Sequence, residues 1–123
     1  MKTLTKAEEQ VMQVLWKQEK GFLKDLVDAM PEPKPHSNTV ATLLKILVEK
    51  QFVSTETIGR MHLYTPLVTK EAYSQSSLSG LVKGYFEGSY SKAVSFLIED
   101  NKLTVEDLEL LLTQLKHKNN DND

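Results

Sequence analysis

The chain has 123 residues, a length that allows one domain or a small domain with an appended interaction segment. Its residues are 40% hydrophobic and 26% charged, with a formal net charge of −2 at pH 7, a composition typical of soluble globular proteins. No run approaches the roughly 18 apolar residues of a membrane-spanning helix, and the N-terminus lacks the apolar region of a signal peptide, so we expect no membrane insertion. With zero cysteines, the sequence excludes disulfides, thiolate metal sites and a cysteine nucleophile, and we expect a cytoplasmic protein.

The charge is distributed unevenly between the two halves. Residues 1–66 contain nine basic and eight acidic residues, whereas residues 67–123 contain six and nine. The basic excess of the first half is small, so it permits a nucleic-acid-binding function there without requiring one.

Two helices are predicted at the start of the chain. The first covers about residues 5–19, because Thr5 and Glu8 can form a capping box before an apolar stripe. Gly21 is predicted to end it in a left-handed conformation. The second is short, over about residues 22–30, and it ends at a proline-rich connector because proline cannot continue a helix.

The third predicted helix begins at His36 or Ser37, either of which can cap it, and runs to about residue 49. Its core face has the helical spacing of Val40, Leu43, Leu44, Leu47 and Val48. Its outer face carries Asn38, Ala41, Thr42, Lys45, Ile46 and Glu49. This mixture is compatible with a core helix whose outer face is solvated, and also with a helix that reads DNA.

A β-hairpin follows, with strands predicted over residues 52–57 and 61–65. Both are rich in β-branched and aromatic residues, and the tight turn between them contains Gly59. Three helices followed by a hairpin within about 66 residues indicate a winged helix-turn-helix. In that arrangement the third helix enters the major groove, and Arg60 lies at the tip of the wing.

The order of these elements therefore favours the DNA-reading alternative for the third helix. Asn38 and Thr42 can hydrogen-bond to base edges, methyl groups of the outer face can contact thymine, and lysines can reach phosphates. A lone arginine at a turn, such as Arg60, more often contacts only solvent. The same alternative applies to Lys34, which can contact a phosphate or only solvent. The predicted DNA-binding residues are Lys34, Ser37, Asn38, Thr39, Ala41, Thr42, Lys45, Ile46 and Arg60.

The remainder of the chain is predicted to be helical, with caps at Thr69, Ser89 and Thr104. Gly80, Gly84 and Gly88 are placed on one helix face, where they either weaken the helix or allow close approach to a partner helix. More large apolar residues are present than three short helices can cover, which indicates a dimer interface. The predicted dimerisation residues are Leu78, Leu81, Val82, Tyr85, Phe86, Val94, Leu97, Leu108, Leu111, Leu112 and Leu115.

The fold class that follows is mainly α with a small β-hairpin wing: a winged-helix DNA-binding domain over 1–69, a helical dimerisation domain over 70–118 and a disordered tail over 119–123. The three histidines are scattered without ligand spacing, so no metal site is expected. No catalytic constellation or phosphate-binding loop is present, so we expect neither an enzyme nor a cofactor.

The chain resembles the penicillinase repressor family (the BlaI/MecI type) over about residues 4–116. The segments that carry the resemblance are LTKAEEQVMQVLW, NTVATLLKILVEKQ, GRMHLYTPL and YFEGSYSKAVSFLIEDNKLTVEDLELL. The resemblance implies a homodimeric bacterial repressor that binds a dyad DNA operator upstream of resistance genes. It also implies release by cleavage within the dimerisation domain, triggered by a membrane sensor with a metalloprotease domain.

The chain departs from the family pattern in three respects. The family's recognition helix often has arginines where this chain has Ala41 and Ile46, and its Asn-Phe cleavage bond corresponds to Ser95-Phe96 here. With no cysteine, the copper-responsive branch and its cysteine-rich site are excluded. The rival hypothesis is a winged-helix protein-interaction module that does not bind DNA, which the small basic excess and the missing arginines favour.

Overall fold

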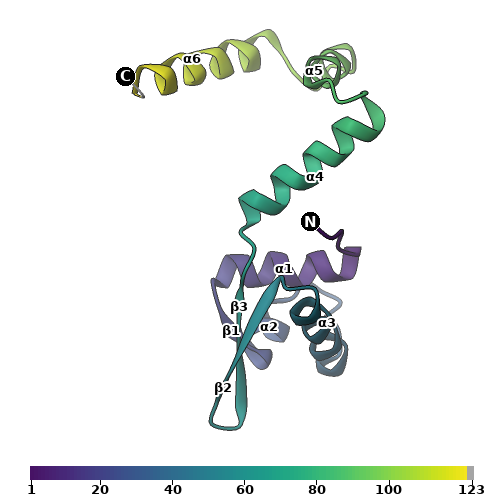
Figure 1. The fold of residues 1–123 in the computed structure, drawn as a ribbon, viewed down its shortest axis with the longest axis vertical. Coiled ribbons are helices and arrows are strands. Elements are labelled where there is room, and N and C mark those ends of the chain that lie inside the picture. The colour runs from purple at the N-terminus through teal and green to yellow at the C-terminus, as the bar shows by residue number, and fades with distance from the viewer. Residues whose placement is uncertain (122–123) are drawn as a thin grey trace. The chain divides into compact units, whose positions relative to one another are not determined.

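The computed structural model describes the backbone of residues 1–121 and the side chains of residues 1–118 (Figure 1). The described residues form six helices and three strands. The helices are α1 (Lys6–Gln18), α2 (Leu23–Ala29), α3 (Ser37–Glu49), α4 (Lys70–Tyr85), α5 (Tyr90–Glu99) and α6 (Val105–Asp121). The strands are β1 (Gly21–Phe22), β2 (Val53–Ile58) and β3 (Met61–Pro66).

The strands form one antiparallel sheet in the order β1-β3-β2. The predicted hairpin is present, and its register runs from Val53 opposite Pro66 to Ile58 opposite Met61. Strand β1 is an addition that the sequence did not predict: Gly21 pairs with Tyr64 and Phe22 with Leu63. A two-residue strand has no periodicity to detect, and only its pairing with β3 defines it.

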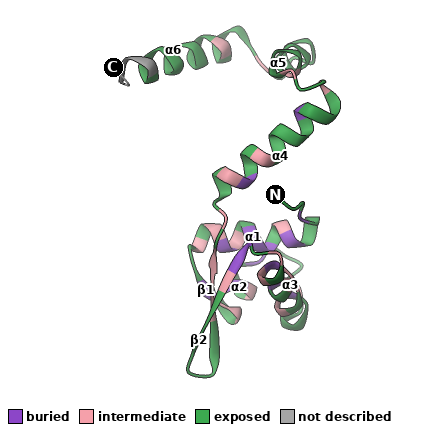
Figure 2. Ribbon diagram, in the orientation of Figure 1, coloured by how far each residue is buried: buried purple, intermediate pink, exposed green. Residues whose placement is uncertain are grey.

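The first compact unit, Met1–Ser77, has one apolar core to which α1, α2, α3 and the hairpin all contribute. Figure 2 shows the buried residues concentrated in these elements. Each large side chain buried in this way stabilises the fold by about 1.5–3 kcal/mol. The core residues are Leu4, Val11, Met12, Leu15, Leu26, Met30, Val40, Leu44, Leu47, Phe52, Val53 and Tyr73. Three helices followed by a hairpin around this core are a winged helix-turn-helix, so the predicted fold class is confirmed.

The predicted capping box of α1 is present, because the Glu8 amide donates to Thr5 Oγ1 and the Thr5 amide to Glu8 Oε2. The predicted left-handed stop at Gly21 is wrong: the residue with positive φ is Glu19, at 71°. Gly21 is instead buried in β1, where an added Cβ would lie 3.0 Å from Leu26 Cδ2. Glycine is therefore favoured there by close packing against the Leu26 side chain of α2 and not by a left-handed turn.

The second compact unit begins at Leu78 and contains the end of α4 with α5 and α6. The Lys92 amide donates to Ser89 Oγ at 3.2 Å, and Thr104 and Asp107 form reciprocal capping bonds of 3.1 Å, as predicted. Within its described residues, Val82 is the buried apolar side chain, at 1% exposure. The helices of this unit are thus mostly exposed when the chain is alone (Figure 2).

The glycine face predicted for α4 is only partly present. Gly80 and Gly84 lie in α4, and a Cβ added at either would meet nothing within 4 Å. Gly88 lies beyond the helix end with φ of 78°, so the prediction that it shares the helix face is wrong. Two consecutive residues after α4 have positive φ, Glu87 at 55° and Gly88 at 78°, and of the two only the glycine adopts this conformation without steric cost from a Cβ.

The boundary between the two compact units lies inside α4, between Ser77 and Leu78, eight residues after the predicted domain boundary at 69/70. The first two turns of α4 belong with the winged helix because Tyr73 is part of its core. Of the predicted tail, residues 119–121 continue α6, and residues 122–123 lie outside the described residues.

Candidate nucleic-acid interface

Helix α3 buries one face and exposes a polar stripe on the other. Val40, Leu44 and Leu47 are fully buried in the core. Four polar residues at helical spacing form the exposed stripe: Asn38, Thr42, Lys45 and Glu49. Thr39 and Ser37 are exposed at its start, whereas Ala41 and Ile46 are half-buried at its edges. The stripe is long enough to present side chains to several consecutive base pairs.

The N-terminus of α3 is capped by a side chain. His36 has extended backbone geometry, and its Nδ1 accepts a hydrogen bond of 3.4 Å from the Asn38 amide. Of the two predicted candidates for this cap, the structure has His36, and Ser37 is the first helical residue. A cap satisfies one of the amides that an α-helix leaves without a partner, so it stabilises the turn that carries Asn38.

The hydroxyl of Thr42 is engaged within the helix. Thr42 Oγ1 donates a 2.9 Å hydrogen bond to the carbonyl oxygen of Asn38, one turn earlier. The hydrogen of the hydroxyl is therefore used, while its oxygen can still accept and its methyl group remains available. A shallow hollow of about 320 Å³ lies beside this pair and is also lined by Thr39 and Leu43.

The wing ends in a tight turn at Gly59 and Arg60. Gly59 has φ of 65°, in the left-handed region, and no atom lies within 4 Å of the position that a Cβ would occupy. Arg60 is exposed beside it, and it is flanked by the exposed apolar pair Ile58 and Met61. Arg60 is therefore free to extend beyond the sheet.

Lys34 has a contact within the protein. Its Nζ donates a 2.8 Å hydrogen bond to the carbonyl oxygen of Asp28, in the last turn of α2. A lysine at this end of a helix satisfies a free carbonyl and interacts favourably with the helix dipole. The residue is exposed, but this bond ties its ammonium group to α2.

A buried ion pair holds the C-terminal end of α3 against α1. The ammonium of Lys50, the residue after α3, contacts both carboxylate oxygens of Glu8, whose residue is only 2% exposed. Burial alone would raise the pKa of Glu8, but hydrogen bonds from Lys50 and Thr5 outweigh it, so the pKa lies below its usual value of 4.5. Both ends of α3 are thus fixed, one by a cap and one by an ion pair.

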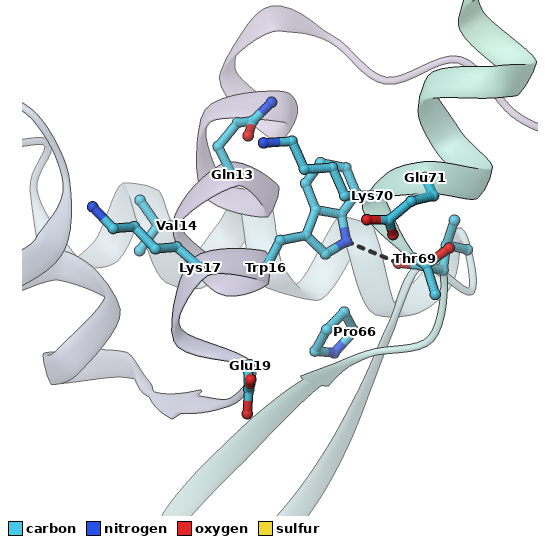
Figure 3. Close-up of a pocket in the computed structure, with 10 residues that line it drawn as sticks. Gln13, Val14, Trp16, Lys17, Glu19, Pro66, Thr69, Lys70 and Glu71 are labelled. Carbon is cyan, nitrogen blue, oxygen red and sulfur yellow. Dashed lines mark hydrogen bonds between the residues drawn. The ribbon is translucent and has the colours of Figure 1, made fainter. Parts of the chain in front are cut away.

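The start of α4 is fixed to α1 by two hydrogen-bonding aromatic residues. Trp16 Nε1 donates to the Val68 carbonyl oxygen at 2.8 Å, the bond drawn in Figure 3. Tyr73 donates its hydroxyl to Glu9 Oε1 at 2.8 Å and accepts from the Leu4 amide at 3.3 Å. Burial, and then the bond to Glu9, raise the pKa of Tyr73.

Beside this junction, α1 and the β3–α4 connection enclose an open cavity of about 840 Å³. In Figure 3, Trp16 and Pro66 lie on its apolar side, and Lys17, Lys70 and Glu71 supply charge around it. The charges are of both signs, so the cavity does not select an anion or a cation by net charge.

In the second unit, most of the predicted dimerisation residues are exposed. Exposed fractions are 53% for Leu78, 51% for Leu111 and 55% for Leu112, while Val82 is buried and Phe86 and Leu108 are intermediate. The Ser95-Phe96 bond lies inside α5. The Phe96 ring centroid is 5.6 Å from that of Phe86, and Phe96 is 54% exposed.

Within the described residues, no group of three His, Asp or Glu side chains is placed to hold a metal ion. In the same part of the chain, none of the helices combines the length and the hydrophobicity required to cross a bilayer.

Comparison with known proteins gives several similar chains. The penicillinase repressor of Bacillus licheniformis is 25% identical over 118 residues, covering 94% of this chain and 92% of that protein. An uncharacterised 16.5 kDa protein from the ptsI 3′ region of Latilactobacillus sakei is 28% identical over 113 residues, covering 91% and 77%. A solved CopR repressor is 35% identical, with a TM-score of 0.47, and the match covers 55% of this chain and 99% of that one.

The model of one protein family, described as penicillinase repressor, matches residues 4–117. The match includes the winged helix and nearly all of the second unit, so it extends over far more than half of the chain. The Bacillus licheniformis relative, which matches over nearly the same residues, is likewise a penicillinase repressor. The chain belongs to the penicillinase repressor family, a family of bacterial winged-helix transcriptional repressors.

Proposed function

We propose that the chain represses transcription in the cytoplasm by binding a two-fold DNA operator as a homodimer, with α3 in the major groove and the wing against the adjoining DNA backbone. The observation that carries the proposal is the exposed polar stripe on the helix that precedes the wing, in which Asn38, Thr42 and Lys45 can contact DNA. An α-helix fits the major groove, where each base pair presents a distinct pattern of donors and acceptors.

Asn38, Thr42 and Lys45 each have a separate role in this proposal. Asn38 can bond in a bidentate manner to adenine, and Lys45 can contact a phosphate or guanine. Because its hydrogen is already donated to Asn38, the Thr42 hydroxyl acts as an acceptor from the exocyclic amine of adenine or cytosine. Ser37 and Thr39 contact phosphates at the start of the helix, and the half-buried Ala41 and Ile46 contact thymine methyl groups.

The test is quantitative binding of the full chain to its own upstream DNA and to random DNA of equal length. Asn38→Ala should reduce the discrimination between them by ~1–3 kcal/mol, because a bidentate base contact is lost. Lys45→Ala should weaken binding to both and lower the salt slope by about one if it contacts phosphate. Lys92→Ala, in the second unit, is the control and should change neither value.

Thr42 provides a finer test in the same assay. Thr42→Val keeps the methyl group and removes the acceptor, and Thr42→Ser does the opposite. Loss of discrimination in the valine variant alone would support the acceptor role. If the Asn38, Thr42 and Lys45 variants lose the same affinity for every DNA sequence, α3 does not read bases. If the wild-type chain binds no DNA, the protein-interaction alternative is favoured.

Homodimerisation is supported by the exposed apolar side chains of the second unit. Leu78, Leu81, Leu111, Leu112 and Leu115 are each 51–55% exposed in the single chain, more large apolar surface than a small helical unit normally leaves in water. A two-fold dimer presents two winged helices to the two half-sites of an operator.

Release of the operator by proteolysis at Ser95-Phe96 is the last part of the proposal. Cleavage there separates the winged helix from α6 and so removes the linkage between two half-site contacts, which can lower the avidity by ~10²–10⁴-fold. A protease needs the bond in an extended form, so α5 must open locally, and Phe96 is covered in the intact dimer. The proposed trigger is a membrane sensor with a metalloprotease domain.

Immunoblots of cells before and after exposure to a cell-wall antibiotic test this step. The expected result is a fragment ending near Ser95 that appears before the target gene is induced. Persistence of the full-length protein while the gene is induced would show that another signal releases the DNA.

A further inference from the structure

The open cavity beside the start of α4 is a candidate ligand site, separate from the exposed stripe of α3. Its volume is about 840 Å³, within the range of about 300–1,000 Å³ that is usual for small-molecule sites. All the residues that line it belong to the first compact unit, so a single winged helix contains the whole site. We refer to it as the junction cavity.

The apolar wall of the junction cavity is built around the ring of Trp16, whose position is fixed. The Nε1 atom of Trp16 already donates to the Val68 carbonyl oxygen at 2.8 Å. The ring of Tyr73, a core residue, packs against the indole with a centroid separation of 5.9 Å. Trp16 is nevertheless only half-buried, and in Figure 3 it lies in the middle of the residues that line the cavity. A flat apolar group can therefore stack on an indole that does not have to move to receive it.

Charged side chains of both signs surround this aromatic wall. Lys70 and Glu71 lie in the first turn of α4, and Lys17 and Glu19 lie at the end of α1. All four are exposed, and neither of the two ion pairs among the described side chains includes them. The cavity thus presents an ammonium group and a carboxylate group beside one apolar surface. This combination is complementary to a ligand that carries a negative and a positive charge on an apolar body.

We propose that the junction cavity binds a small aromatic zwitterion, with the size and chemistry of an aromatic amino acid. The ring of the ligand stacks on Trp16 and contacts Pro66, its carboxylate pairs with Lys70, and its ammonium group pairs with Glu71. These contacts come from α1, from the last residue of β3 and from the start of α4, so only the folded winged helix brings them together. The inference goes beyond the proposed DNA-binding function and does not depend on it.

Titration of the full chain with L-phenylalanine in the absence of DNA is the first test. Trp16 is the only tryptophan of the chain, so the tryptophan fluorescence reports on the cavity itself. Phenylalanine should change this emission in a saturable way, with a dissociation constant on the order of 0.1–1 mM, as expected for a ligand of about a dozen non-hydrogen atoms.

Three modified probes separate the contacts of the ligand. L-alanine lacks the ring, N-acetyl-phenylalanine lacks the ammonium group, and phenylalanine amide lacks the carboxylate. Each should bind about tenfold more weakly than phenylalanine, because one of the three contacts is lost. Isothermal titration calorimetry measures the same affinities without relying on fluorescence.

Two variants of the chain assign the charged contacts. Lys70→Ala and Glu71→Gln should each weaken phenylalanine binding about tenfold. Phenylalanine amide should lose nothing further in Lys70→Ala, and N-acetyl-phenylalanine should lose nothing further in Glu71→Gln. Lys6→Ala is the matched control, since Lys6 is an exposed lysine at the opposite end of α1, and it should bind phenylalanine as the wild type does. Thermal unfolding without ligand verifies that each variant is folded.

Three results would overturn the proposal. Fluorescence and heat that stay unchanged up to about 10 mM phenylalanine would show that the half-buried indole serves only in packing. Equal affinities for alanine and phenylalanine would show that no ring stacks on Trp16. Equal losses in Lys6→Ala and Lys70→Ala would place the ligand outside the junction cavity. Because none of these measurements involves DNA, each of these failures is distinguishable from a failure of the proposed repressor function.

Discussion

At the scale of single residues, polar groups in the interior are each paired, and these pairs fix the recognition helix and the junction with α4. Among the described side chains, none has a buried nitrogen or oxygen atom without a hydrogen-bond partner. Glu8 is the buried charged residue, and Lys50 and Thr5 supply its partners. Breaking such a pair leaves an unsatisfied group in the core, which costs more than the bond contributes.

Replacement of Glu8 by glutamine should lower the free energy of unfolding at pH 7 by about 1.5–3 kcal/mol, the range for a hydrogen bond to a charged group. Because the folded pKa of Glu8 lies below its usual value of 4.5, the ion pair contributes fully above that pH and is lost as the pH falls through the folded pKa. Urea unfolding at a series of pH values measures both effects.

The difference between wild type and Glu8→Gln should therefore shrink below about pH 4.5. Glu71→Gln, an exposed residue in the first turn of α4, is the control. A difference that stays constant down to pH 3 would contradict the ionic origin of the stabilisation.

Tyr73→Phe keeps the ring that packs on Phe52 and Trp16 but removes the hydroxyl that bonds Glu9 and Leu4. The expected loss is about 1–3 kcal/mol of unfolding free energy, because the Leu4 amide loses its partner in the interior. Tyr85→Phe, at a side chain that is 80% exposed, should change stability by less than about 0.5 kcal/mol. If thermal denaturation shows the same loss of stability for both substitutions, the Tyr73 hydroxyl does not stabilise the contact between α4 and α1.

At the scale of elements, the wing depends on one backbone conformation. The turn between β2 and β3 places Gly59 at φ of 65°, and the strands on either side pair over all six residues of each. A side chain at this position would have space, but residues other than glycine rarely adopt its positive φ. The free-energy cost of a substitution therefore comes from the backbone conformation and not from a steric clash.

Gly59→Ala should therefore destabilise the winged helix by about 1 kcal/mol, in spite of the empty space around the glycine. Gly80→Ala is the matched control, since Gly80 also has nothing within 4 Å but lies inside the α-helix α4. There alanine should be neutral or stabilising by up to about 1 kcal/mol. Denaturant unfolding of both variants checks the contrast, and a loss at Gly80 with none at Gly59 would contradict it.

At the scale of the whole molecule, the two compact units differ in what they bury. The winged helix has a twelve-residue core, whereas the apolar side chains of α5 and α6 are mostly exposed. Exposed apolar area of this extent is unfavourable in water unless a second surface covers it. The second unit is thus the part of the molecule that the proposed dimer would stabilise most.

Leu111→Asp should convert the proposed dimer into monomers or make the chain insoluble, because the substitution places a charge in the middle of the apolar surface of α6. Leu112→Asp should act in the same way. Sedimentation at micromolar concentration distinguishes the states, with the exposed Lys102→Asp as a control for added negative charge. A wild-type chain that sediments as a monomer would contradict dimerisation through this surface.

Local sequence patterns determined most of the elements of this protein. The capping boxes at Thr5 and Thr104, the apolar stripe of α3 and the glycine turn of the wing each act within a few residues, so they can be recognised before any tertiary contact is known. Their order along the chain is enough to predict a winged helix, and with it the exposed face of α3.

Tertiary structure alone decided the features that join distant segments. Strand β1 exists because β3 pairs with it, and Gly21 is favoured by its close packing against Leu26 of α2. Tyr73 accepts a hydrogen bond from the amide of Leu4, 69 residues away in sequence. One small cleft likewise brings Lys24 of α2 together with Arg60 of the hairpin turn and His62 of β3. Periodicity reports which face of a helix is buried, but it contains no information about which remote residues share a surface, because that depends on how the elements pack.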